Sequence, residues 1–343
     1  MKDILTPRER FGMLVIDEKP DRCPVMPLIT SHAATVAGIK LKRYYTSGEK
    51  MAKAQIIACE LYQHDAISIF SEVGIVAEAM GSEFYYPDND LPVLRNPALK
   101  DNLTDKLIIP NPKREGRLPV YLDAIKYAYK AIGDIIPILA YLPAPFTTGM
   151  HLLPPDKFLI NTLKNPEEIK IILDAVFEAT IKFCFEIINA GALPIIVDPL
   201  ASGSVISPAV YKEIALVYEQ RLVDYLHRYD FDVILHICGD TTTIIDNILY
   251  TNADLISLDR VNMARAMEKL SNKMRLIGNF DTGSILLSDP EEIYRTTAIM
   301  VEQLKFARKG YIASTGCEVP IKAKRENVLA FIKAAKEKGW YWV

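Results

Sequence analysis

Short apolar runs alternate with longer amphipathic stretches along most of the 343-residue chain. Runs rich in Ile, Val and Leu predict buried strands, and stretches with apolar residues every three or four positions predict helices. Eight runs fit buried strands: 24–30, 65–70, 135–142, 193–198, 233–238, 254–259, 276–281 and 310–315. Most of them precede a segment long enough for one helix, which is the repeat of a parallel α/β fold.

The number of strands decides between two parallel architectures. Eight strand–helix repeats favour a (β/α)8 barrel, also called a TIM barrel. An open doubly wound sheet is the alternative, but such sheets usually stop at about five to seven strands. The chain contains no low-complexity linker and no Gly/Ser-rich hinge, so residues 1–343 are expected to form a single barrel domain.

Several helix starts are marked by their capping residues. Thr6-Pro7-Arg8-Glu9 combines an N-cap, a proline at the first helical position and a glutamate three residues after the cap, which predicts an N-terminal helical segment. Asn165-Pro166 and Asp289-Pro290 repeat this pattern. The stretch near 85–120 is rich in Pro, Asn and Asp and predicts a long excursion between the second and third strands. In a barrel, such an excursion helps to build the mouth of the site.

Composition and charge exclude several classes of protein. Half of the residues are apolar, 24% are charged and the net charge is −3, so no nucleic-acid or membrane partner is expected. The N-terminus lacks the apolar segment of a signal peptide, and no apolar run reaches transmembrane length. Five cysteines in a chain of this length do not suggest a disulfide framework. Reduced thiols and a cytoplasmic location are therefore expected.

The ends of the predicted strands carry candidate metal ligands. His236 and Cys238 close the fifth strand, and Cys317 follows the eighth. Residues two apart on a strand point to the same side, and active sites of these barrels lie at the C-terminal ends of the strands. The three side chains would therefore meet. One His and two Cys with an open fourth position is typical of catalytic zinc, because structural zinc usually has four protein ligands.

Four other residues at strand ends are candidates for orienting a substrate: Glu72, Asp198, Asp259 and Asn279. Glu72 would place a charged group at the mouth of a hydrophobic strand. Asp198 and Asp259 have a structural alternative, since each could cap the helix that follows. We also consider that Asp259 or Glu72 fills the fourth metal position in the resting state. Further polar residues follow the same strands: Ser31, His32, Ser202, Asp240, Arg260, Asp281 and Glu318.

The remaining cysteines and histidines are expected to be structural. Cys59 and Cys184 lie on apolar helical stretches and fit inert core thiols. Cys23 precedes the first strand, at the end of a barrel where no chemistry is expected. Three histidines lie beside turns or helix ends: His64, His151 and His227.

Longer motifs resemble a known family. They begin with Thr6–Phe11 and Pro20–Val25 and continue through Ala77–Gly81, Asp198–Ser202 and Ile206–Pro208. The most specific are His236-Ile237-Cys238-Gly239-Asp240, Gly278-Asn279 and Gly316-Cys317-Glu318-Val319-Pro320. With these motifs the chain resembles the uroporphyrinogen decarboxylase superfamily nearly end to end. Within it, the chain is most similar to the corrinoid-dependent methyltransferases.

The resemblance implies a fold, a metal and a partner. It implies a (β/α)8 barrel with zinc held by His236, Cys238 and Cys317, and a small corrinoid protein whose cobalt docks over the barrel mouth. Zinc can hold a thiol as thiolate, ready to take a methyl group from methyl-cobalt(III). It can also polarise a methyl ether oxygen while cobalt(I) takes the methyl group. Two thiolates and one neutral His leave the zinc site formally neutral, which favours the thiol version.

Two other functions stay open at this point. The first is a decarboxylase of the same superfamily, which carries an arginine-rich segment after its first strand. The corresponding residues 29–34 contain no arginine, so a substrate with many carboxylates would find few cationic partners there. The second is a non-catalytic protein that binds the corrinoid protein. The sequence leaves open the methyl donor or acceptor, which could be a thiol, an aryl ether or a folate, and the oligomeric state.

Overall fold

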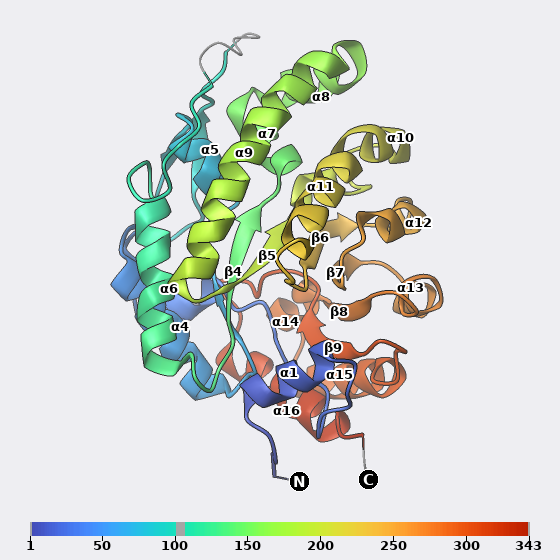
Figure 1. The fold of residues 1–343 in the computed structure, drawn as a ribbon. Helices are drawn as coiled ribbons and strands as arrows, with labels where there is room; N and C mark the ends of the chain where they lie inside the picture. The colour runs from blue at the N-terminus through green and yellow to red at the C-terminus, as the bar shows by residue number, and fades with distance from the viewer. Residues whose placement is uncertain (1, 101–106, 342–343) are drawn as a thin grey trace.

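The computed structural model describes residues 2–100 and 107–341. A curled sheet of seven parallel strands lies at the centre, with helices packed around its outside (Figure 1). The strands follow one another around the sheet in chain order. They are β1 (Ile67–Ile69), β4 (Ile138–Pro143), β5 (Leu193–Val197), β6 (Ile234–Asp240), β7 (Leu255–Arg260), β8 (Arg275–Phe280) and β9 (Tyr311–Thr315).

Helices precede, separate and follow the strands of the sheet. The first half of the chain contains α1 (Pro7–Val15), α2 (His32–Val36), α3 (Leu41–Thr46), α4 (Gly48–Tyr62), α5 (Ile75–Ala79), α6 (Leu118–Ile132), α7 (Pro145–Leu152), α8 (Pro155–Lys164) and α9 (Pro166–Ala190). The second half contains η2 (Pro199–Ala201), α10 (Pro208–Val210), η3 (Tyr211–Ala215), α11 (Leu216–His227), α12 (Ile245–Ile248), η4 (Leu249–Thr251), α13 (Met263–Leu270), α14 (Thr282–Leu287), α15 (Pro290–Leu304) and α16 (Arg325–Lys338). Among the described residues, no helix has the length and apolar character needed to cross a membrane.

The eighth position of the barrel is filled by an irregular segment. Residues 24–30, predicted to be the first strand, lie between β9 and the start of β1. Val25 makes an isolated parallel bridge to Ala313, and its carbonyl accepts a hydrogen bond of 2.8 Å from the Asp65 amide. The segment therefore closes the ring of strands without being a strand itself.

Two prolines explain why this segment is not a regular strand. Pro24 and Pro27 have no amide hydrogen to donate to a neighbouring strand, so a continuous ladder cannot form. The prediction of an α/β barrel fold is confirmed. The prediction of eight regular strands is wrong in this one place, where the structure has seven strands and a bridging segment.

The helix starts follow the capping residues, with one exception. Thr6 and Glu9 form the predicted capping box of α1. Asp289 caps α15 by accepting a hydrogen bond from the Glu292 amide. Asn165 makes no side-chain cap at α9, although that helix begins at the predicted place.

The predicted excursion contains a small hairpin. The strands β2 (Glu83–Tyr85) and β3 (Val93–Asn96) pair antiparallel, and the chain returns to the barrel at α6. Residues 101–106 of this excursion lie outside the described residues. The residues between the two strands reach the C-terminal ends of the barrel strands, as the cavity described below shows.

The interior of the barrel is packed with apolar side chains taken from alternate positions of the strands. Leu139 and Tyr141 of β4 and Ile195 and Val197 of β5 point inward and belong to one buried cluster. Ile234 of β6 joins the same cluster. Because the side chains of a strand alternate between its two faces, the next inward positions of β6 are 236 and 238. The core therefore ends where the candidate metal ligands begin.

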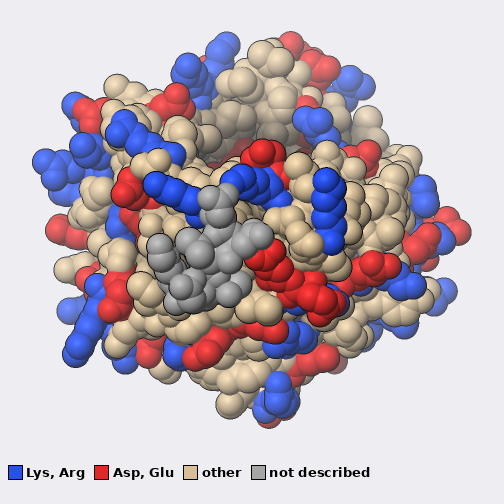
Figure 2. Space-filling view, turned by 90° about the horizontal axis from the view of Figure 1, so that it is seen from above, with Lys and Arg blue, Asp and Glu red and all other residues tan. Residues whose placement is uncertain are grey.

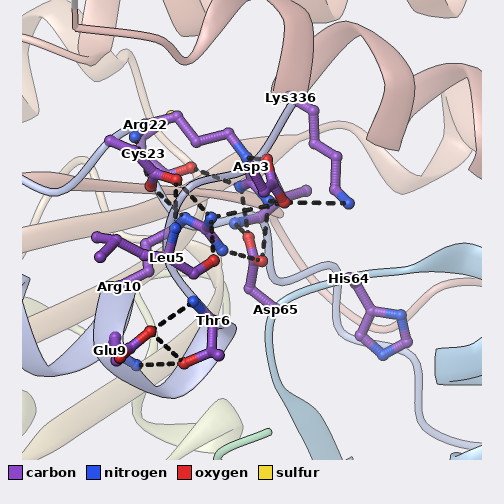
Figure 3. Close-up of polar contacts among 12 residues, drawn as sticks. Asp3, Leu5, Thr6, Glu9, Arg10, Arg22, Cys23, His64, Asp65 and Lys336 are labelled. Carbon is purple, nitrogen blue, oxygen red and sulfur yellow. Dashed lines mark hydrogen bonds and ion pairs between the residues drawn. The ribbon is translucent and has the colours of Figure 1, made fainter. Parts of the chain in front are cut away.

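The N-terminal ends of the strands carry a buried network of charges. Arg10 and Arg22 are fully buried, and both form ion pairs with Asp65, at 2.8 Å and 2.6 Å. Asp21 pairs with Arg10 at 2.7 Å, and Asp3 pairs with Arg22 at 2.7 Å. Figure 3 shows Arg10 of α1, Arg22 just before the bridging segment and Asp65 just before β1 converging with Asp3. The network ties the N-terminal helix to the base of the barrel.

Candidate metal centre and cavity

Three side chains converge at the C-terminal ends of β6 and β9. His236, Cys238 and Cys317 place their ligand atoms within 4.8 Å of one another. His236 is buried, whereas the two cysteines are half-buried. Among the described residues, no other group of three or more His, Cys, Asp or Glu side chains is close enough to hold a metal ion. The structure thus brings together the three residues predicted as zinc ligands.

A hydroxyl group orients the imidazole of this set. The Nδ1 atom of His236 lies 2.9 Å from the Oγ atom of Ser257, which is buried on the neighbouring strand β7. The hydrogen bond leaves Nε2 as the ring nitrogen that is available to a metal. Metal-binding histidines commonly use their other nitrogen in this way, which holds the ring in one orientation.

The two thiols are free and lie close enough together to bind one metal ion. Their sulfur atoms are 3.0 Å apart and do not form a disulfide. Tetrahedral zinc with Zn–S bonds of about 2.3 Å needs a separation of roughly 3.8 Å, a small opening of this pair. The hydrogen bond with Cys238, and burial after it, raise the pKa of the Cys317 thiol well above its usual value. A divalent cation would reverse this, because it favours the thiolate form.

Close approach explains two glycines beside the ligands. A Cβ atom at Gly316 would lie 2.6 Å from the Oδ1 atom of Asp259, so only glycine lets the chain pass between β7 and Cys317. Gly239 has a φ of 76°, which disfavours other residues. Both glycines are therefore required by the local geometry of the metal centre.

A cavity of about 330 Å³ opens beside the three ligands. Its wall is mainly apolar and its polar groups come from strand ends. The lining residues are Leu28, Phe70, Ser71, Glu72, Val73, Leu91, Pro92, Tyr141, Val197, Pro199, Leu200, His236, Cys238, Cys317 and Glu318. Figure 2 views the molecule from this side and shows a hollowed face with both acidic and basic side chains around it.

Glu72 lines this cavity but is held by an ion pair. Its Oε1 atom lies 2.5 Å from Nη2 of Arg117, and its Oε2 atom accepts a hydrogen bond from Ser71. Burial raises the pKa of Glu72, while Arg117 opposes the shift. Glu72 therefore lies after β1 as predicted, but its carboxyl group is held in place by Arg117 and Ser71.

Glu318 is a second carboxyl group in the cavity. It directly follows Cys317, and Thr30 donates a hydrogen bond to its Oε2 atom. Burial raises the pKa of Glu318. Sequence reasoning noted it only as one polar residue among others after the last strand. Its position next to a ligand in the sequence was the available signal.

Asp259 and Asn279 lie on β7 and β8 behind the candidate ligands and do not line the cavity. The Oδ2 atom of Asp259 accepts from the Gly239 amide at 2.9 Å and lies 3.5 Å from the sulfur of Cys238. Asn279 donates to the backbone carbonyls of Asp259 and Val261. The group of atoms within 4.8 Å contains neither Asp259 nor Glu72 as a fourth ligand.

Asp198 points away from the cavity. Its Oδ1 atom accepts hydrogen bonds from the amide and hydroxyl groups of Thr147 in the first turn of α7. Its Oδ2 atom and Oε1 of Glu219 are buried without a donor among the described residues, and the two carboxyl groups face each other. Burial raises the pKa of both. A single shared proton would satisfy the pair, so Asp198 anchors the chain beneath the cavity wall.

The other cysteines and histidines lie elsewhere in the fold. Cys23, Cys59 and Cys184 are buried and free, and none of them lines the cavity. Burial lowers the pKa of His64 to about 4, and this residue lies near the N-terminal ends of the strands (Figure 3). His151 bonds to the Thr147 carbonyl one turn earlier in its own helix.

Comparison with known proteins gives a consistent result. The family model described as uroporphyrinogen decarboxylase (URO-D) matches residues 6–338. A methylated-thiol–coenzyme M methyltransferase from Methanosarcina mazei is 26% identical, over 97% of this chain and 90% of its own length. The methylcobamide:CoM methyltransferase MtaA from Methanosarcina barkeri is also 26% identical, over 95% of this chain and 96% of its own length.

Decarboxylases and solved structures extend the comparison. A uroporphyrinogen decarboxylase from Photobacterium profundum is 26% identical, but over only 80% of this chain and 79% of its own length. A solved methyltransferase structure from Methanosarcina mazei has a TM-score of 0.88 at 24% identity, and covers 97% of this chain and 99% of its own. At this level of identity the structural match supports the fold. The methyltransferases thus match this chain over a larger share than the decarboxylase does.

Proposed function

The chain belongs to the uroporphyrinogen decarboxylase family, and from that premise we propose that it is a corrinoid-dependent methyltransferase that activates its small substrate on zinc. One observation carries the proposal: His236, Cys238 and Cys317 converge beside a cavity at the C-terminal ends of the strands. Three soft ligands and an adjacent cavity suit catalytic zinc, which keeps one position open for a substrate. The relatives that match nearly full length are methyltransferases named for coenzyme M or methylcobamide.

The direction that we propose runs from the corrinoid to a thiol. When bound, zinc supplies the Lewis acidity that lowers the pKa of a substrate thiol and leaves its sulfur nucleophilic at neutral pH. In this direction the substrate sulfur would take the methyl group from the corrinoid that the partner carries. The electron pair of the carbon–cobalt bond would stay on cobalt, and the thiol proton would leave to solvent.

The residues of this chain bind and orient the reactants. His236 is held in one ring orientation by Ser257, and Asp259 fixes the turn at Gly239 beside Cys238. The apolar cavity wall excludes water from the reacting sulfur, which strengthens the electrostatic interactions there. The partner in this proposal is a small corrinoid protein that docks over the cavity and carries the methyl group.

A second candidate is the reverse, substrate-side reaction. In that case a methyl ether would enter the cavity and cobalt(I) of the corrinoid protein would take its methyl group. The lining is mainly apolar and includes the aromatic rings of Phe70 and Tyr141, which suits an aryl ether and favours this alternative. Decarboxylation of a porphyrinogen is a weaker candidate, since the described lining of the cavity contains no Lys or Arg to bind many carboxylates.

The absorbance spectrum of cobalamin distinguishes these functions. Zinc-loaded protein is mixed with methylcobalamin and a panel of thiols, and separately with cobalt(I) cobalamin and a panel of methyl ethers. Loss of the methyl–cobalt band in the first mixture is the expected result. Appearance of that band in the second would establish the reverse reaction instead. If both spectra stay unchanged, also with corrinoid protein supplied, the proposal of methyl transfer is wrong.

A further inference from the structure

We propose that the small molecule taken up by this cavity is uncharged or positively charged and donates hydrogen bonds from its head group, and that it is not an organic anion such as coenzyme M. This inference rests on the proposed function and specifies the substrate class. The charged side chains that line the cavity, apart from its metal ligands, are the two acids Glu72 and Glu318. Within the described part of the chain, no Lys or Arg lines it.

The arginine that pairs with Glu72 has no donor left for an anion. Arg117 lies behind Glu72, with its guanidinium carbon 4.1 Å from the centre of the Tyr86 ring. All five of its N–H groups are engaged with other groups of the protein. The partners are the carboxylates of Glu72 and Glu78, the Tyr45 carbonyl, and the hydroxyl groups of Ser71 and Tyr86. Its charge is thus shared between two carboxylates instead of facing the cavity.

Glu318 offers the acceptor that a donating head group needs. Thr30 occupies its Oε2 atom, and none of the described residues donates a hydrogen bond to Oε1. Because Glu318 directly follows Cys317, this acceptor lies beside the metal centre. Glu72 and Glu318 follow β1 and β9, which are separated in the barrel only by the bridging segment 24–30. The two carboxyl groups therefore make one side of the cavity acidic.

The apolar part of the lining increases the cost of placing an anion here. Phe70, Tyr141, Val197 and Leu200 supply an apolar wall, which lowers the local dielectric constant. An anion loses its water on entering such a cavity and must be compensated by a cation or by hydrogen-bond donors. A sulfonate would instead face two acids. The basic side chains visible around this face in Figure 2 are not part of the cavity lining.

Three thiols that differ only in their head group test the proposal. Coenzyme M, 2-mercaptoethanol and cysteamine share a two-carbon thiol arm and carry a sulfonate, a hydroxyl and an ammonium group. Protein loaded with cobalt(II) in place of zinc develops a thiolate-to-metal charge-transfer band when a thiol binds, so affinity is measured without turnover. After correction for the thiol pKa values, we expect coenzyme M to bind at least tenfold more weakly than the other two.

Two matched variants assign the effect to the cavity. Glu72→Gln removes one acid from the lining and frees part of the charge of Arg117, so it should tighten coenzyme M binding at least fivefold. Glu78→Gln removes the other partner of Arg117, which does not line the cavity, and should change this affinity less than twofold. The thiol series on the unmodified protein stands even if either variant fails to fold.

The outcomes separate this inference from the proposed function. Coenzyme M binding as tightly as cysteamine and 2-mercaptoethanol would overturn the charge selectivity and leave the methyltransferase proposal intact. No charge-transfer band with any thiol, together with an unchanged methylcobalamin spectrum, would overturn the proposed function itself. Weak binding of coenzyme M alone supports the inference.

Discussion

The two ends of the barrel differ in how their polar side chains are paired. At the N-terminal ends of the strands, Arg10 and Arg22 are buried, and each charge meets carboxylates at 2.6–2.8 Å. At the C-terminal ends, His236, Cys238 and Cys317 face one another and no cation of the described chain lies among them. At the first end the buried arginine and aspartate charges are paired within the protein, whereas the second end brings together candidate ligand atoms that a metal ion would satisfy.

The difference separates stability from function. Breaking a buried ion pair leaves an uncompensated charge and destabilises the fold strongly. Removing a half-buried thiol from the cavity removes a ligand but little packing. In TIM barrels the C-terminal ends of the strands carry chemistry and the opposite ends carry stability, and we expect this chain to follow that division. Each prediction below tests one side of it.

The largest effect is expected from a change at the metal centre. Cys317→Ala should abolish stoichiometric zinc binding and slow methyl transfer by about 10⁴-fold, because the substrate thiol is no longer held as a thiolate on zinc. Its free energy of unfolding without metal should change by less than about 1 kcal/mol. Metal analysis, the methylcobalamin assay and urea denaturation measure the three quantities.

Cys184→Ala is the matched control for that variant. Cys184 is a buried core thiol of α9, away from the cavity. It should keep one zinc per chain and full activity while losing roughly 1 kcal/mol of stability. Equal zinc content in both variants would contradict the assignment of Cys317 as a ligand.

The next largest effect is expected at the other end of the barrel. Asp65→Ala removes the one carboxylate that pairs with both Arg10 and Arg22, leaves their buried charges only partly compensated, and should destabilise the protein by about 3–5 kcal/mol. The fraction that stays folded should still bind zinc normally. Asp88→Ala, which breaks an exposed pair with Lys40, should cost less than about 1 kcal/mol. If Asp65→Ala removes zinc from folded protein, the two ends are not independent.

A smaller effect is expected behind the metal ligands. Ser257→Ala removes the hydrogen bond to Nδ1 of His236 and should weaken zinc affinity by roughly 10–100-fold without changing the ligand set. Competition with a chelator measures this affinity. Ser257→Thr, which retains the hydroxyl group, should recover most of it. Unchanged affinity in Ser257→Ala would show that the imidazole needs no such support.

The smallest effect concerns the pH dependence of stability. Asp198 and Glu219 have raised pKa values in the folded protein, because both are buried. The folded state therefore binds protons more tightly than the unfolded state. Their stabilising contribution is complete below the unfolded pKa values near 4, and it falls as the pH rises through the raised folded values.

Glu219→Gln should remove the loss of stability that this carboxyl pair causes at high pH. The amide can donate to Asp198, so the variant should be more stable than the unmodified protein at pH 8 by about 1–2 kcal/mol and no more stable at pH 4. Thermal melting at pH 8 and pH 4 tests the sign of this difference in stability.

The Asp21 carboxyl shows the opposite pH dependence. Burial acts to raise its pKa, but hydrogen bonds from Arg10 and the backbone hold the pKa far below its usual value. Its contribution is lost only in strong acid.

The convergence of the three candidate metal ligands was predictable because its signal is local. His236 and Cys238 are two residues apart on a strand, and that spacing alone places both on one side. Cys317 needed only the assumption that the last strand belongs to the same barrel. The irregular first segment could also have been predicted, since neither Pro24 nor Pro27 has an amide hydrogen to donate.

Other features depend on packing that no local pattern encodes. Glu72 meets Arg117, which lies 45 residues further along the chain. Asp198 turns toward Glu219 on α11 and Thr147 on α7, so its place after a strand did not reveal that it lies outside the cavity wall. Ser257 lies behind His236 only because β6 and β7 pair in one register. Long-range contacts of this kind decided which strand-end residues face the cavity.

X-ray absorption at the zinc K-edge tests the central claim most directly, measured on zinc-loaded protein before and after addition of cysteamine. The account predicts two sulfur atoms and at least one nitrogen around zinc in the first spectrum, from Cys238, Cys317 and His236. It predicts a third sulfur in the second spectrum. A zinc environment without sulfur, or a sulfur count that stays at two when the thiol is present at saturating concentration, would contradict it.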